Sequence, residues 1–323
     1  MHYESLQLNK GMDAVVPFSN QTGTCRWAQD LMQKNPALLR QRHTVRQAIE
    51  YFILQQLDTL LVVREADLVH SLKLAGRICI KDVLRLILPG LLRKDIAGLH
   101  EALGTPVDDI LIAHPKTMTP WSNVIDIVGA MLADYTQVVG VEQDGKLAGQ
   151  VNSQAILKLY VNATHAKSVV EDDNLSPASQ THAEDIMAGY VICLEPDDDI
   201  ARAICLFLAT ASRYIPVLDK QARLVGILSQ QDILEYISIL MDPVCLSMFE
   251  NKDSILDRPV GTLLKKEPQS IVGKVKLPEA ARLIVGESSG CLAVTDTQRK
   301  FCGILSYSEI FNWIVRHTQI FEN

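Results

Sequence analysis

The chain has 323 residues, of which 48% are apolar, and a formal net charge of −7. This length accommodates two ordinary domains with their own cores. No uncharged apolar run reaches the roughly 18 residues that a membrane-spanning helix needs, and no Lys/Arg-rich stripe offers a binding surface for DNA or RNA. We therefore expect a soluble cytoplasmic protein without membrane or nucleic-acid partners.

Residue types that carry chemistry are scattered along the chain. The seven cysteines are odd in number and form no C-x-x-C pair, and the eight histidines have no ligand spacing. The sequence also lacks a P-loop, a G-x-S-x-G motif and an H-E-x-x-H motif. We expect no metal site, no required cofactor and no enzymatic activity.

The first half of the chain contains a polar arm and two repeats. Residues 1–25 form the arm, which has little periodicity. The repeats cover 26–89 and 105–162, and the segment Leu91 to Leu103 between them could itself form a helix.

The second half begins after a change in composition. Residues 163–182 are polar and rich in helix breakers, as linkers are. Two further repeats follow at 183–241 and 258–316. The sequence thus predicts two modules, 26–162 and 183–320, and we expect each to fold separately.

Three landmarks recur in the four repeats. Each repeat has an opening triplet, which in chain order is Asp30-Leu31-Met32, Asp109-Ile110-Leu111, Asp185-Ile186-Met187 or the weaker Thr262-Leu263-Leu264. Each has an apolar helical face at i, i+3, i+4, i+7 and i+8, which starts at Val45, Val124, Ile200 or Leu277. Each has a glycine that closes the second strand of its hairpin. In chain order these are Gly76, Gly149, Gly226 and Gly303, at intervals of 73, 77 and 77 residues. A period near 77 is typical of small domains rather than of common solenoids.

Within one repeat, the pattern predicts an α+β unit in the order strand-helix-strand-strand-helix. The two adjacent strands form a hairpin, with turns at Gln143 to Lys146 and Asp219 to Ala222. A unit of roughly 60 residues buries only a modest part of its surface alone. We therefore expect the repeats to pair within each half.

The order D-[IL]-M, amphipathic helix, [IL]-P-V-h-D and L-V-G-h-h-S-x-x-D resembles the cystathionine-β-synthase (CBS) domain. Repeat three matches almost throughout, in Asp185-Ile186-Met187, Ile215 to Asp219 and Leu224 to Asp232. The layout of four repeats is similar to that of the γ regulatory subunit of AMP-activated protein kinase and of stand-alone prokaryotic CBS proteins. The resemblance covers about nine tenths of the chain. It implies four CBS repeats paired into two pseudo-twofold Bateman modules.

In that family, the cleft of each pair binds adenosine-containing ligands such as AMP, ADP, ATP or S-adenosylmethionine. The resemblance implies that Asp232 accepts hydrogen bonds from ribose and that Ser229 lies beside phosphate, where a helix start offers unpaired N–H groups. Arg213, just before the strand, is the natural added cation; its counterparts Asp58, Thr136 and Gly290 are not basic. The implied neighbours of the base are Val191, Ile192, Tyr214, Ile215 and Pro216.

Repeats four and one contribute weaker candidates. Lys265 and Lys266 follow the opening triplet of repeat four and could meet phosphates, although exposed lysines are usually only solvated. Ser306 and Glu309 stand at the motif positions of that repeat. In repeat one, the motif has Asp82 but a cysteine in place of the serine, so any nucleotide of the first module depends on Asp82.

The same motif has a purely structural interpretation. Ser-x-x-[DE] is a helix capping box, in which the serine accepts from a backbone N–H and the acid reaches back to the cap. For Ser306 and Glu309 we prefer capping, whereas the family context favours ligand binding for Ser229 and Asp232, where both roles can coexist. Repeat two has Asn152 and Ala155 at these positions, which excludes a ribose contact by this route.

Three functions are compatible with these features. The first is a ligand-sensing regulator that binds an adenine nucleotide in the second module and signals occupancy to a partner, as a homodimer or with an unknown regulated protein. The second is an interaction or dimerisation scaffold without a ligand, which the missing motif residues of repeats one and two favour. The third, an unusual enzyme, has no residue pattern in its support.

Overall fold

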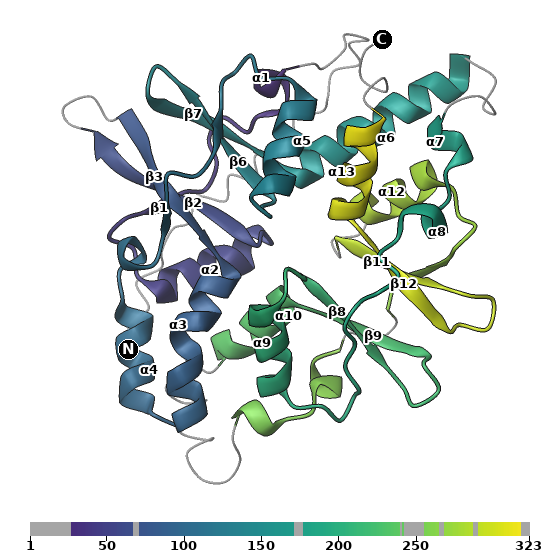
Figure 1. The fold of residues 1–323 in the computed structure, drawn as a ribbon. Helices are drawn as coiled ribbons and strands as arrows, with labels where there is room; N and C mark the ends of the chain where they lie inside the picture. The colour runs from purple at the N-terminus through teal and green to yellow at the C-terminus, as the bar shows by residue number, and fades with distance from the viewer. Residues whose placement is uncertain are drawn as a thin grey trace, which may run out of the picture.

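The structure is a computed structural model, and it describes residues 27–66, 71–170, 177–239, 241, 255–264, 268–286 and 290–317. Four similar α+β units surround a common centre (Figure 1). The predicted arm at 1–25 and the candidates Lys265 and Lys266 lie outside the described residues. In the described part of the chain, no helix is long and apolar enough to cross a bilayer.

Each unit has the predicted order of strand, helix, strand, strand and helix. Repeat one consists of β1 (Leu39–Arg40), α2 (Val45–Gln55), β2 (Thr59–Ala66), β3 (Ser71–Cys79) and α3 (Ile80–Arg93). Repeat two consists of β5 (Thr117–Met118), α5 (Val124–Ala133), β6 (Val138–Gln143), β7 (Lys146–Asn152) and α6 (Ser153–Val170).

The second half repeats this order with one reduction. Repeat three consists of α9 (Ile200–Ala209), β8 (Tyr214–Leu218), β9 (Leu224–Ser229) and α10 (Gln230–Ile239). Its opening strand is reduced to a parallel bridge between Leu194 and Val217. Repeat four consists of β10 (Ser270–Val272), α12 (Leu277–Gly286), β11 (Cys291–Thr295), β12 (Phe301–Ser306) and α13 (Tyr307–Arg316).

Short elements connect these units and precede each opening strand. The segments that contain the opening triplets form single helical turns, α1 (Ala28–Leu31), η1 (Val107–Asp109), α8 (Ala183–Ile186) and η3 (Val260–Leu263). The connectors contain α4 (Ile96–Gly104), β4 (Ile112–Ala113), α7 (Pro177–Gln180) and η2 (Ile255–Asp257). The acid of the triplet caps its turn: the Asp185 carboxylate accepts from the backbone N–H of His182 at 2.7 Å.

The four hairpins share one register. In each hairpin the antiparallel ladder shifts by one residue, at Val62, Val141, Val217 and Val294. Each of these valines is paired with the repeat glycine of the next strand, which is Gly76, Gly149, Gly226 or Gly303. The predicted hairpins are therefore confirmed, and they are equivalent down to the bulge.

The repeat glycines explain why the opening triplets recur. A Cβ on Gly303 of repeat four would lie 2.6 Å from the carbonyl oxygen of Ala188 and 2.9 Å from Sδ of Met187, both in the opening segment of repeat three. The opening segment of each of the other repeats likewise packs on the repeat glycine of the partner repeat in its module. The third residue of the opening triplet lies beside that glycine, in the pairs Met32 with Gly149, Leu111 with Gly76, and Leu264 with Gly226. Repeats one and two, and repeats three and four, thus exchange their opening segments.

The helices pack in the other direction, between modules. One core contains Phe52 and Leu84 of repeat one together with Phe207 and Leu234 of repeat three, all fully or nearly fully buried. The second core joins helices of repeats two and four in the same way, with Tyr160 and Trp313 in an edge-on ring contact. The four units therefore close a ring, in which sheets contact within modules and helices contact between them (Figure 1).

Three expectations from the sequence need correction. The expectation that each half folds separately does not fit the shared cores, because a single half would expose the helical faces that its counterpart covers. The predicted linker 163–182 is partly helical, since α6 runs to Val170 and α7 begins at Pro177. The helix α3 also continues through Pro89, beyond the predicted end of repeat one.

The close approach at Gly303 predicts a loss of stability on substitution. Gly303→Ala should lower the free energy of unfolding by about 1–3 kcal/mol, because the new methyl group overlaps the Ala188 carbonyl. Gly129→Ala is the matched control: it lies within α5 with no atom within 4 Å of its Cβ position and should gain about 0.5–1 kcal/mol. Urea unfolding measures both, and equal effects of the two substitutions would contradict the packing.

The shared cores predict that the halves remain together after the chain is cut. A protease site introduced between Val170 and Pro177 should yield two fragments that co-elute as one particle in size-exclusion chromatography, because separation would expose both helical cores to water. Fragments that elute apart without denaturant would show that each half is an independent domain.

Candidate functional site

The motif of repeat three forms a helix cap at the start of α10. One oxygen of Asp232, Oδ2, accepts from the backbone N–H of Ser229 at 2.8 Å and from its hydroxyl at 2.6 Å. In return, Ser229 Oγ accepts from the N–H of Asp232 at 3.1 Å. The capping box is therefore present.

The other three repeats have equivalent caps. Glu309 accepts from the N–H and the hydroxyl of Ser306 at 2.7 and 2.6 Å. Asp82 accepts from the N–H of Cys79 at 2.9 Å, and in repeat two the side chain of Asn152 accepts from the N–H of Ala155 at 2.8 Å. All four closing helices thus begin on a side-chain cap.

The motif acids of repeats three and four converge. Cys291 opens β11 and is fully buried, and its pKa is raised by burial and then by the negative charges of Glu309 and Asp232. Both carboxylates thus act on one thiol, although they belong to different repeats. Burial also raises the pKa of Glu309, against the lowering effects of the Ser306 hydrogen bonds and of Arg213.

Two tyrosines border the same region. Tyr214 opens β8 opposite Ser229, and burial followed by the charges of Cys291 and Tyr307 raises its pKa well above the ordinary value. Burial raises the pKa of Tyr307 to about 12. Gly290 has a φ of +68°, and a Cβ there would overlap the Tyr214 hydroxyl, so a glycine is needed where the two repeats meet.

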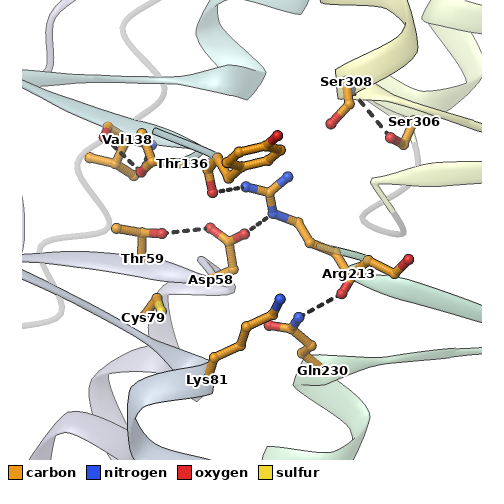
Figure 2. Close-up of polar contacts among 12 residues, drawn as sticks. Asp58, Thr59, Cys79, Lys81, Thr136, Val138, Arg213, Gln230, Ser306 and Ser308 are labelled. Carbon is orange, nitrogen blue, oxygen red and sulfur yellow. Dashed lines mark hydrogen bonds and ion pairs between the residues drawn. The ribbon is translucent and has the colours of Figure 1, made fainter. Parts of the chain in front are cut away.

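Arg213 binds residues of the other module. Its guanidinium forms an ion pair with Asp58 of repeat one and donates to the backbone carbonyl of Tyr135 in repeat two. Burial by itself lowers the pKa of Arg213, but the Asp58 carboxylate outweighs it and the net effect is a raised pKa. Figure 2 shows Arg213 reaching between Asp58, Lys81 and the helix start at Ser306 and Ser308.

Sequence reasoning missed Asp58 and Lys81 as members of this region. Lys81 is the second residue of α3, and its ammonium group donates to the carbonyl of Thr210 in repeat three. Its pKa is lowered by burial, and Arg213 contributes to this lowering. A signal for Asp58 did exist, because Asp58 and Arg213 hold equivalent positions in their repeats and have opposite charges.

The remaining candidates differ in exposure. Ile215 belongs to the core shared by repeats one and three, and Pro216 is also buried, so their side chains face away from solvent. Val191 is half-buried and Ile192 is 47% exposed in the segment before Leu194. Within the described residues, no group of three or more His, Cys, Asp or Glu could hold a metal ion.

Comparison with known proteins identifies this architecture. Residues 183–239 match the CBS domain family. The structure is similar to that of protein MJ1225 from Methanocaldococcus jannaschii, a proposed archaeal homologue of γ-AMPK, with a TM-score of 0.74 and 17% identity, over 89% of this chain and 99% of that one. Repeat three thus matches the CBS domain, and the fold of MJ1225 extends over 89% of this chain.

Two further likenesses agree with this fold. In sequence, MJ1225 is 22% identical over 208 residues, which are 64% of this chain and 69% of the relative. An uncharacterized conserved protein from Pyrococcus horikoshii has a TM-score of 0.56 at 16% identity, over 89% of this chain and 99% of that one. The CBS repeats of this chain thus have the α+β fold and the multi-CBS arrangement that the sequence predicts.

Because the pKa of Glu309 is raised, the substitution Glu309→Gln should increase the free energy of unfolding in a pH-dependent way. A buried acid with a raised folded-state pKa destabilises the fold once it ionises, so Glu309→Gln should stabilise relative to wild type above the raised pKa. The gain should disappear below pH 4.5, the ordinary value, where both states of the wild type are protonated. Urea unfolding across this range measures it.

Glu279→Gln is the matched control, because Glu279 lies at an exposed helix start of the same repeat. It shows how the loss of an exposed carboxylate changes the stability. If the difference between Glu309→Gln and wild type is largest at low pH, the assigned direction of the pKa shift is wrong.

Proposed function

We propose that this protein is a regulatory sensor that binds an adenine nucleotide, or a related adenosine-containing ligand, in its second CBS pair. Ligand occupancy is signalled to a partner, either a second copy of the chain or a regulated protein, in the cytoplasm. The role is regulatory rather than catalytic, and adenine nucleotide is a bound ligand rather than a cofactor.

The convergence of Asp232 and Glu309 is the observation that supports this proposal most. They begin the closing helices of two different repeats, and both act electrostatically on Cys291. Cys291 is paired with Ser306, the residue that Glu309 caps, in the hairpin of repeat four. Two half-buried carboxylates beside one buried residue are suited to accept hydrogen bonds from the two hydroxyl groups of a ribose. The capping hydrogen bonds orient the Asp232 carboxylate at the start of α10.

The surroundings of this carboxylate pair suit the other parts of such a ligand. Tyr214 and Tyr307 supply aromatic surface, and the start of α10 supplies the positive end of a helix dipole for a phosphate. Half-buried Val191 and exposed Ile192 lie on the segment that leads into Leu194 and can contribute apolar contact with a base.

A ligand-free scaffold is the second candidate. It is favoured by the capping geometry, because each motif acid already has a structural role at its helix start. Repeat two has no acid at the motif position, and repeat one has no serine. A scaffold would show no affinity for adenosine, AMP, ATP or S-adenosylmethionine.

Asp232→Ala is the decisive substitution. A charge-assisted hydrogen bond contributes about 1.5–3 kcal/mol, so its loss should weaken the affinity for AMP by roughly 10- to 150-fold. Isothermal titration calorimetry measures this, after an unfolding curve has shown that the variant is folded.

The matched control is Asp199→Ala, which removes the N-cap of α9 in the same repeat. It should lower the stability by about 1 kcal/mol and leave the affinity unchanged. Unchanged AMP affinity in a folded Asp232→Ala variant would refute the assignment, and a wild-type protein that binds none of the four ligands would support the scaffold.

A further inference from the structure

We propose that Asp58 determines the charge of the ligand that the second CBS pair accepts. Asp58 pairs with Arg213 and so neutralises a cation beside the site. The site then favours adenosine derivatives of low negative charge, namely adenosine or its monophosphate, over ATP. This inference rests on the proposed function and adds a specificity-determining residue that lies in the other module.

The first step is the position of Arg213 beside the motif. Its backbone carbonyl accepts from the N–H of Gln230, the first residue of α10, at 3.1 Å. The start of the helix that begins with Ser229 and Asp232 is thereby tied to Arg213. The guanidinium charge also reaches Glu309, whose pKa it lowers in part. A phosphate at this helix start would thus meet Arg213 first.

The second step is that Arg213 is already neutralised and held. Its partners come from two other repeats, the Asp58 carboxylate from repeat one and the Tyr135 carbonyl from repeat two. The Asp58 carboxylate is itself oriented by the hydroxyl of Thr59, at 3.0 Å. The side chains of Arg213 and Asp58 are only 16% and 14% exposed, so water screens this pair weakly.

The third step is the balance of charge around the site. Arg213 and Lys81 are two of its cations; Lys81 donates to the carbonyl of Thr210, and Arg85 also acts on Lys81. Asp58, Asp232 and Glu309 are among its acids. While Arg213 is paired with Asp58, it does not offset the repulsion that Asp232 and Glu309 exert on each further negative charge of a ligand.

A stabilising role alone gives a poor account of this pair. Buried ion pairs are often no more stabilising than apolar residues of similar volume. The hairpin register corrects the counterpart expected in repeat two from Thr136 to Gln137, so the equivalent positions of repeats two and four have the uncharged Gln137 and Gly290. The charge pair therefore exists on only one diagonal of the ring. This diagonal includes repeat three, which has the complete serine and aspartate motif.

The test compares adenosine, AMP and ATP by isothermal titration calorimetry against wild type and Asp58→Asn. Wild type should bind adenosine and AMP at least as tightly as ATP. Asp58→Asn keeps the acceptor for Thr59 but frees the charge of Arg213, and the ratio of ATP affinity to adenosine affinity should rise on the order of tenfold, the effect of one unit charge at several ångströms.

Two further variants separate this effect from a general gain of positive charge or loss of packing. Glu235→Gln removes one carboxylate from the same interface between repeats one and three, where Glu235 accepts from Gln56 at 3.2 Å, without contact to Arg213, and should leave the ratio unchanged. In an Arg213→Ala background, Asp58→Asn should raise the ratio by less than it does when Arg213 is present, because no guanidinium charge is released and only the repulsion by the Asp58 carboxylate is lost.

An unchanged ratio in folded Asp58→Asn, or wild-type affinity for ATP tenfold above that for adenosine, would overturn this inference and leave the proposed function standing. A shift of equal size in Glu235→Gln would also overturn it. If neither wild type nor Asp58→Asn binds any of the three ligands, the proposed function and this inference both fail.

Discussion

This architecture depends on the burial of the helices, which remain exposed after the sheets of two repeats have paired. A CBS repeat of roughly 60 residues has two helices beside a small sheet, and it cannot cover the sheet and both helices by itself. The sheets contact within each pair, where the opening segments are exchanged over Gly76, Gly149, Gly226 and Gly303. The helices then remain uncovered, and repeats one with three and two with four bury them in common cores.

This closure of the ring determines what lies at its centre. The residue that precedes the second strand of each repeat is Asp58, Gln137, Arg213 or Gly290 in chain order. The ion pair of Arg213 with Asp58 and the close approach of Gly290 to Tyr214 bring equivalent positions of different repeats together at this centre. Closing helices also begin near this point, which brings their positive dipole ends and their capping acids together. A polar centre enclosed by apolar cores follows from the symmetry, and the individual residues decide what that centre can bind.

The sequence predicted the repeats well and their assembly less well. The recurring glycines and the hairpin turns are local features, and the structure confirms the hairpins that they predict. The use of each helical face depends on contacts more than 100 residues apart, such as Gln231 with the carbonyl of Phe52, and periodicity cannot reveal which repeat supplies the partner. The same holds for Arg213: its helix-start neighbourhood is local and predictable, whereas its pairing with Asp58 requires knowledge that repeats one and three face each other.

The Asp58–Arg213 pair also relates ligand binding to the arrangement of the modules. A ligand that takes Arg213 from Asp58 must compensate for a carboxylate left without its partner inside the protein, which is costly. By the same thermodynamic cycle, a change that separates repeats one and three frees Arg213 and raises the affinity for an anionic ligand. In the proposed function, binding energy and the packing of the two modules are coupled through the Arg213 guanidinium, because its partners belong to one module and its backbone to the other. A regulatory protein needs such a coupling, since a ligand shifts a conformational equilibrium only by its difference in affinity for the two states.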